Sequence, residues 1–158
     1  MSEQTYDSRK DTQEHIDKVA GYLTHFSDIL MDRSYCHDAS KLESPEKEYF
    51  DKYTPRLASL EYGTPEYTAN IQDLKPAIDH HYTVNSHHPQ FYENGVNGMN
   101  LFDIVEMFAD WKAAGERGKN GNIYKSIDIN AEKFGISKQL KQILINTAKY
   151  LGYELPKL

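Results

Sequence analysis

The sequence predicts an all-α fold, a single helical bundle of about six helices. Apolar residues recur at three- and four-residue steps along several segments, helix-start signals precede them, and no run alternates convincingly as a strand. A chain of 158 residues suits one domain better than two. We therefore expect one domain over 1–158, with its functional core at about 11–114 and its C-terminal helices at 122–152.

Apolar spacing and helix-start signals define the helices of the first half. Residues 11–31 predict an amphipathic helix whose apolar face carries Ile16, Val19, Tyr22, Leu23, Phe26, Ile29 and Leu30. The triplets Ser-Pro-Glu at 44–46 and Thr-Pro-Glu at 64–66 each combine a hydroxyl N-cap, a proline at the first helical position and an acid near the positive end of the helix dipole. They predict one helix to about residue 60 and a second toward residue 80, which Pro76 should restart or kink.

A loop and three further helices are expected in the second half. Residues 83–99 are rich in Asn and Gly and lack periodicity, which predicts a loop. Helical spacing returns at 101–114, and a further segment at 122–134 ends before Gly135, a suitable C-terminal cap. Ser137 is the expected N-cap of a last helix that runs to about residue 151.

Charge and cysteine content limit the partners and the compartment. The 18 Lys and Arg against 24 Asp and Glu give a net charge of −6, which argues against nucleic acid as the main partner. No stretch approaches the roughly 18 apolar residues that span a bilayer, and no apolar signal core begins the chain, so no membrane partner is expected. The single cysteine, Cys36, cannot form an internal disulfide, which favours a reducing cytoplasm.

The chemistry concentrates in the histidines and their acidic neighbours. Five of the seven histidines lie beside another His or an Asp: His37, His80, His81, His87 and His88. The pair His37-Asp38 begins the string HDASK, and imidazole with carboxylate suits a borderline or hard divalent metal. Lys41 follows His37 by four residues and so would share its helix face. Its ammonium could there hold an anionic group against the metal.

The upstream His15, the HDxSK string and a later Asp resemble the HD-domain superfamily of metal-dependent phosphohydrolases. The resemblance covers about residues 15–112, and the segments HHPQFYENG and LFDIVEMFADWKAA are similar to a small family of HD-like proteins from phages and bacteria. It implies an HD-like helical domain in a bacterial or phage-infected host cytosol, and homo-oligomers as in similar proteins. It also implies a metal-activated water that attacks phosphorus in a nucleotide or related small phosphate ester.

The resemblance implies a set of metal ligands. His15, His37 and Asp38 match three of them, and the fourth is a late Asp. Asp110, in the context Phe-Ala-Asp-Trp, is favoured over Asp103, and Glu106 lies between these two on the same face, where it could bond to a ligand.

Two-metal branches of the superfamily carry extra histidines, which His81 and one of His87 or His88 match here. A second ion held by these histidines would leave Asp38 bridging the pair. The implied cofactor is one or two divalent ions of Fe, Mn, Ni or Co, with Mg as a further option.

Several residues receive roles in the expected reaction. Lys41 would neutralise phosphoryl charge, and His81 and His88 would hold a second ion or protonate the leaving oxygen. The residues expected to contact the substrate phosphate are Lys41, His87, Arg117 and Lys119.

Structural and functional alternatives stay open at this level. The His87-His88 pair could cap a turn, Asp103 could serve its helix dipole, and Arg117 and Lys119 could be solvated loop. The protein could also be a non-catalytic nucleotide- or metal-binding module for sensing or sequestration. A di-iron oxidative enzyme would use the same ligands.

Overall fold

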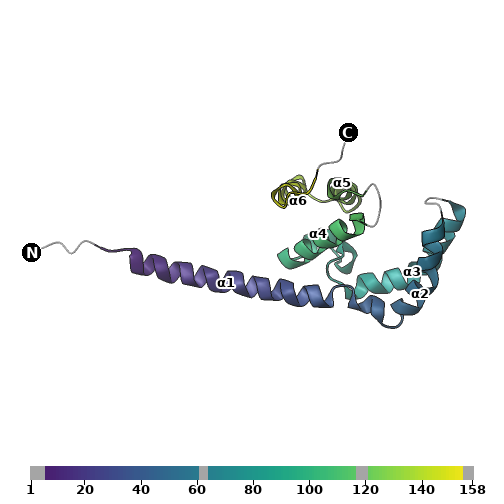
Figure 1. The fold of residues 1–158 in the computed structure, drawn as a ribbon, viewed down its shortest axis with the longest axis horizontal. Helices are drawn as coiled ribbons and strands as arrows, with labels where there is room; N and C mark the ends of the chain where they lie inside the picture. The colour runs from purple at the N-terminus through teal and green to yellow at the C-terminus, as the bar shows by residue number, and fades with distance from the viewer. Residues whose placement is uncertain (1–5, 61–63, 117–120, 155–158) are drawn as a thin grey trace, which may run out of the picture. The chain divides into compact units, whose positions relative to one another are not determined.

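The computed structural model describes residues 6–60, 64–116 and 121–154 (Figure 1). Within these ranges it contains six α-helices, three short 3-10 helices and no strand, which confirms the all-α prediction. The α-helices are α1 (Arg9–Cys36), α2 (Glu46–Ser59), α3 (Pro65–Val84), α4 (Leu101–Glu116), α5 (Ile123–Lys133) and α6 (Lys138–Tyr150). The 3-10 helices are η1 (Ala39–Leu42), η2 (Pro89–Phe91) and η3 (Gly95–Gly98).

Three of the predicted helix ends are confirmed by their capping contacts. The Thr64 side chain accepts a hydrogen bond from the Tyr67 backbone N–H at 3.2 Å, with Pro65 at the first turn of α3. Ser137 accepts one from the Leu140 N–H at 3.2 Å and caps α6 in the same way. Gly135 follows α5 with a φ of 62°, a left-handed conformation that glycine adopts without steric cost.

The predicted N-cap of α2 is wrong, and of the two alternatives for Pro76 the restart is excluded. Pro45, rather than Ser44, is the N-cap of α2, and no side-chain hydrogen bond caps that helix. α3 continues through Pro76 without a break. Leu74 and Ala77, on either side of this proline, are buried in a cluster with Tyr53 of α2, and such packing offsets the hydrogen bond that proline removes.

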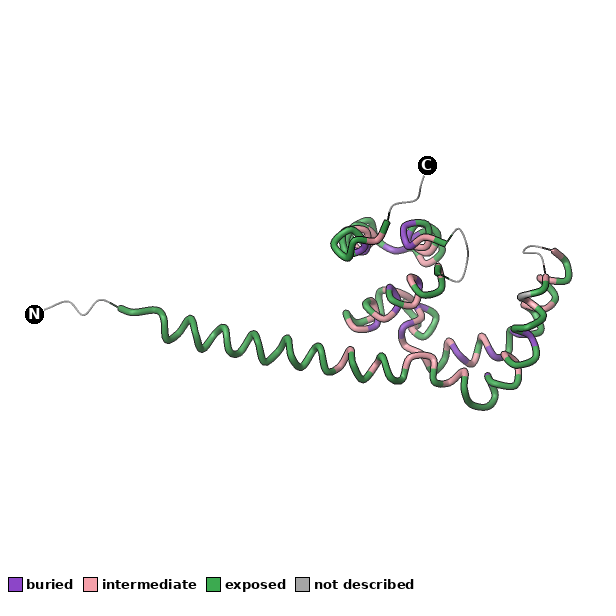
Figure 2. Tube along the Cα trace, in the orientation of Figure 1, coloured by how far each residue is buried: buried purple, intermediate pink, exposed green. Residues whose placement is uncertain are grey.

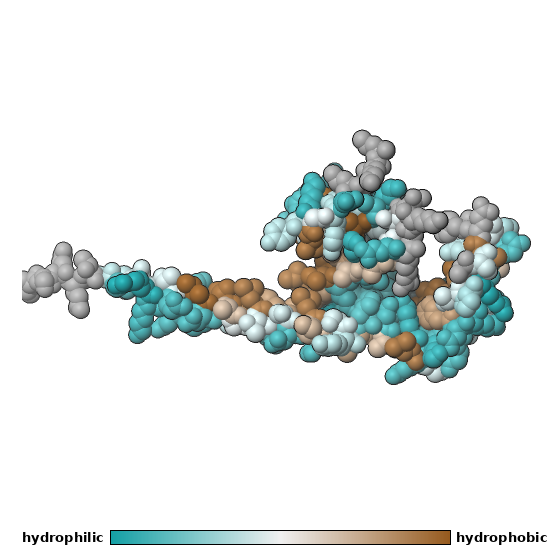
Figure 3. Space-filling model, viewed as in Figure 1, coloured by the Kyte–Doolittle hydropathy of each residue, from teal (hydrophilic) through white to brown (hydrophobic). Residues whose placement is uncertain are grey.

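The chain divides into two compact units, one ending at Cys36 and one beginning at His37. Among its described residues the first unit is the helix α1, which carries its apolar stripe along one side (Figure 3). The organisation as one domain therefore stays a prediction. No helix in the described part of the chain is long and apolar enough to cross a membrane.

The second unit has two buried clusters (Figure 2). The larger one joins α4, α5 and α6 around Met107, Trp111, Ile127 and Leu144, and the smaller joins α2 and α3. The histidine-rich segments belong to α3 and to the stretch that leads from it toward α4. These clusters therefore hold the elements that carry the candidate site.

Candidate metal centre

The His37-Asp38 pair lies in a turn, not on a helix as predicted. α1 ends at Cys36 and η1 begins at Ala39, and Asp38 between them has a φ of 57°, in the left-handed region. Asp tolerates this region better than most residues that carry a Cβ. The helix-face argument for Lys41 is therefore wrong, although its Nζ does reach the pair by donating to Asp38 Oδ2 at 2.6 Å.

One group of ligand atoms forms around Asp38 Oδ1. The distance from this oxygen to Nε2 is 3.1 Å for His81 and 3.5 Å for His87, and the Nε2 atoms of His81 and His88 are 2.9 Å apart. These four residues each place one ligand atom within 4.8 Å of the others, so the group could hold a metal ion. The group combines the turn at Asp38, the residue His81 of α3 and two histidines of the segment that follows α3.

Two atoms of this group are buried and lack a hydrogen-bond partner, namely Asp38 Oδ1 and His87 Nε2. Buried polar atoms are normally paired, because leaving one without a partner costs free energy. A cation between them would satisfy both atoms at once. Burial, together with the neighbouring His87 and His81, lowers the pKa of His88 to about 3, so this imidazole is neutral, as metal binding requires.

A second group uses the other oxygen of Asp38. His37 Nε2 lies 3.6 Å from Asp38 Oδ2 and 3.8 Å from Asp110 Oδ1, and these three residues also form a set that could hold an ion. Burial opposes ionisation of Asp38, but the contacts with His81 and Lys41 outweigh it and keep the pKa of Asp38 well below its ordinary value. Asp38 is thus an ionised carboxylate that faces both groups.

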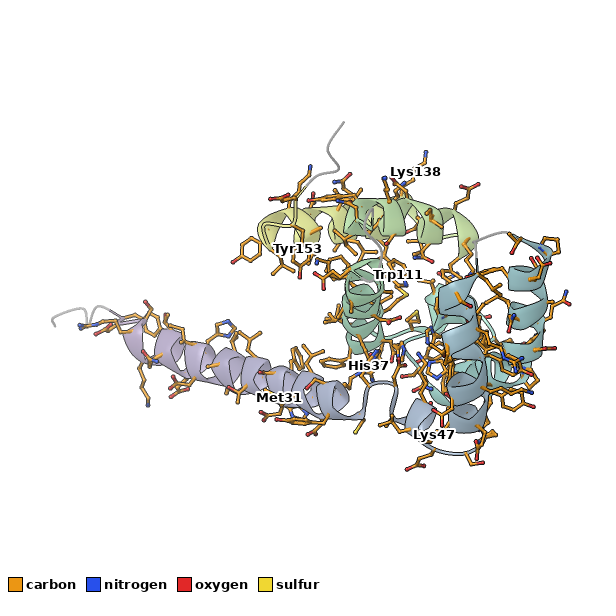
Figure 4. All side chains as sticks on the ribbon, turned by 45° about the vertical axis from the view of Figure 1, so that its right-hand side comes forward. Met31, His37, Lys47, Trp111, Lys138 and Tyr153 are labelled. Carbon is orange, nitrogen blue, oxygen red and sulfur yellow. The ribbon has the colours of Figure 1, made fainter. Side chains whose placement is uncertain are left out.

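Glu106 supports both groups from α4, which lies close to His37 in Figure 4. Its Oε1 is 2.8 Å from His37 Nδ1 and 3.0 Å from His87 Nδ1. The bond to Glu106 raises the pKa of His37 against the opposing effect of burial. His37, His87 and Glu106 also form a third set of ligand-type atoms. Glu106 contacts the Nδ1 atoms of both rings, with a hydrogen bond to His37, and this leaves each Nε2 toward its own group.

The two predicted aspartates of α4 have different surroundings. Asp110 is part of the second group, whereas Asp103 is fully buried and belongs to none of the groups found among the described residues. Asp103 accepts hydrogen bonds from Ser86 Oγ at 2.7 Å, Tyr92 OH at 2.6 Å and the Asn100 N–H at 3.0 Å. Its role in the structure is to hold the segment between α3 and α4.

The remaining predicted residues lie elsewhere. His15 is on α1 in the first unit, and no metal-competent group in the described ranges includes it. Arg117 and Lys119 lie outside the described residues. The ligand role of His15 and the phosphate contacts of these two cations stay predictions.

The sequence did not single out Glu46 as part of the site. The Ser-Pro-Glu triplet predicts only an acid at the start of a helix, but the Glu46 side chain is fully buried. Its carboxylate contacts His80, His81 and Ser40 at 2.8, 2.9 and 3.0 Å. Burial opposes its ionisation, and these hydrogen bonds prevail, so its pKa is lowered from the ordinary value. No local pattern predicts a contact across so many residues.

Comparison with known proteins places the chain in a family. No curated protein and no solved structure matches it. A family model matches residues 4–150, which include every element that forms the candidate centre. The chain therefore belongs to DUF5662, a family of unknown function.

Proposed function

We propose that this protein is a metal-dependent phosphohydrolase whose centre holds two divalent ions bridged by Asp38. The observation that carries the proposal is the position of this carboxylate. Its Oδ1 belongs with three histidine Nε2 atoms and its Oδ2 with His37 and Asp110. The resemblance of HDASK and its surroundings to HD-domain phosphohydrolases supports the same conclusion.

The donor set favours a transition metal. Three imidazoles and one carboxylate oxygen in the first group suit Fe, Mn, Co or Ni, whereas Mg prefers oxygen ligands and retained waters. The second group, with one imidazole and two carboxylates, is harder in character. In this arrangement His81 and His88 would be metal ligands, so neither would act as the proton donor.

The charges of the centre favour an anionic substrate. The carboxylates of Asp38, Glu46, Glu106 and Asp110 balance two divalent ions, and Lys41 then leaves one net positive charge. Lys41 Nζ lies 2.6 Å from Asp38 Oδ2, the oxygen that the second ion would also contact. With that ion bound, the ammonium lies close to a like charge, and an anion between them relieves the repulsion. A phosphoryl group fits this position.

Lys41 and Glu106 would then have separate roles in the reaction. Bound ions of this kind lower the pKa of a coordinated water and polarise a phosphoryl oxygen. Lys41 binds and orients the phosphoryl group and offsets the charge that develops on it. Glu106 holds the rings of His37 and His87 in place.

Metal analysis of selected variants combined with a phosphatase screen tests the proposal. We expect two ions per chain in protein purified without chelator, one in His88→Ala or Asp110→Asn, and a large loss of both in Asp38→Asn. The metal-loaded wild type should hydrolyse nucleotides or simple phosphate esters.

Other outcomes of this test point elsewhere. Stoichiometric metal retained by Asp38→Asn would remove the basis of the bridged centre. Metal binding without turnover of any phosphate ester would favour a sensing or sequestering module. Oxygen consumption by the iron form would favour an oxidative enzyme.

A further inference from the structure

Glu46 holds two neighbouring histidines of α3 with one carboxylate. We propose that Glu46 is a positioning residue of the metal centre, which fixes His81 in the tautomer that presents Nε2 to the ion. The inference rests on the proposed function and adds to it a residue that touches neither metal nor substrate. It follows from the contacts of Glu46, from its burial and from the limited proton count of a neutral imidazole.

The contacts of Glu46 come from two elements, α3 and η1. Oε1 is 2.8 Å from His80 Nδ1, and Oε2 is 2.9 Å from His81 Nδ1 and 3.0 Å from Ser40 Oγ. Glu46 and His81 are 0% and 3% exposed, so water does not compete for these bonds. The carboxylate also begins α2, where the helix dipole favours a negative charge.

Ser40 restricts the hydrogen bonds further. Its hydroxyl donates to Glu46 and accepts from Asn85 Nδ2 at 2.8 Å, while Asn85 Nδ2 also donates to the His81 carbonyl at 2.9 Å. Ser40 Oγ therefore faces His81 Nδ1, 3.1 Å away, as an acceptor. Asn85 Nδ2 also lies 2.9 Å from His81 Nδ1, but its two protons are donated to Ser40 Oγ and to the His81 carbonyl. The Glu46 carboxylate and Ser40 Oγ both face Nδ1 as acceptors, and they favour a proton on this nitrogen.

The position of the proton decides what the other nitrogen can do. A metal-bound imidazole is neutral and has a single N–H, so a proton that Glu46 holds on Nδ1 leaves the lone pair of His81 on Nε2 for the ion. This Nε2 faces Asp38 Oδ1 at 3.1 Å, which is also an acceptor. A lone pair and a carboxylate oxygen at this distance repel each other, and a metal ion between them or a second proton on the ring removes this repulsion. Glu46 thus converts His81 into a metal ligand from the side opposite to the ion, as carboxylates behind histidine ligands do in other metal centres.

The test uses the full-length chain and the substitution Glu46→Gln. A glutamine keeps the shape of the side chain but has one acceptor oxygen, so it cannot take protons from His80 and His81 together. Glu48, also in the first turn of α2 but exposed, supplies the matched control Glu48→Gln, which removes the same charge from the helix start. We expect Co²⁺ affinity to fall about 10- to 100-fold in Glu46→Gln and to stay unchanged in Glu48→Gln.

A second measurement needs no variant. Long-range proton–nitrogen NMR spectra of the metal-free wild type report which nitrogen of His81 carries the proton, and we expect Nδ1. An Nδ1 without a proton would overturn the inference whether or not Glu46→Gln folds.

The outcomes separate this inference from the proposed function. Equal Co²⁺ affinity in Glu46→Gln and wild type would refute the positioning role and leave the metal centre intact. A wild type that binds no Co²⁺, Mn²⁺ or Fe²⁺ would overturn the proposed function together with this inference.

Discussion

Exchanging each aspartate of α4 for asparagine should separate a structural role from a metal-binding role. Asp103 is 0% exposed and accepts hydrogen bonds from Ser86, Tyr92 and the Asn100 backbone. Asp110 has a side chain that is 26% exposed and lies 3.8 Å from His37 Nε2. Asp103→Asn should therefore lower the free energy of unfolding, and Asp110→Asn should lower metal affinity.

The contacts set the size of both effects. A hydrogen bond to a charged group is worth about 1 kcal/mol more than a neutral one, so loss of the Asp103 charge from three bonds should cost about 3 kcal/mol. In a chain of this size that corresponds to a Tm lower by roughly 6–12 °C. Asp110→Asn should change stability by no more than about 0.5 kcal/mol, as is usual for surface positions. It should weaken the ion at His37 by at least about a hundredfold, the upper end of what outer contacts of a metal site contribute.

Thermal unfolding of the metal-free variants, followed by metal titration of the folded proteins, measures both effects. Asp103→Asn should still bind both ions at temperatures where it is folded. The reasoning fails if Asp103→Asn loses an ion while its Tm is unchanged, because Asp103 would then be the late ligand. Two tightly bound ions in Asp110→Asn would be equally damaging.

The remaining predictions concern Lys41, the metal and acid pH. Lys41→Met should keep its metal yet hydrolyse phosphate esters about ten- to a thousandfold more slowly, and an unchanged steady-state rate would show that the lysine contacts no phosphoryl group. Adding metal at a hundred times its Kd should stabilise the metal-free protein by about 2.7 kcal/mol for each occupied site, and a Tm insensitive to metal and chelator would contradict this. Folding lowers the pKa values of Asp38 and Glu46. The stabilisation that these carboxylates provide is therefore present above their unfolded pKa values near 4 and is lost as the pH falls below them. Denaturant titrations from pH 6 to 3 should detect this loss. Asp38→Asn should flatten that dependence.

The helices could be predicted from the sequence because their signals are local. Apolar spacing and capping residues act within a few positions of one another, so Thr64 and Ser137 identify helix starts without knowledge of the rest of the fold. The histidine and aspartate types likewise indicated a divalent metal before any geometry was known. Pro45 takes the N-cap position expected of Ser44, and α3 continues through Pro76, where packing against α2 offsets the hydrogen bond that the proline removes.

The sequence by itself thus determined the all-α fold, the helix boundaries to within a few residues and the chemical class of the candidate ligands. Only the tertiary structure decided which atoms meet. The left-handed turn at Asp38 directs its two oxygens to different groups, Asp110 rather than Asp103 lies beside His37, and Glu46 reaches His81 across 35 residues of chain. Helix propensity and capping are energies of neighbouring residues, whereas these contacts depend on how α2, α3 and α4 pack, and no short-range pattern encodes that packing.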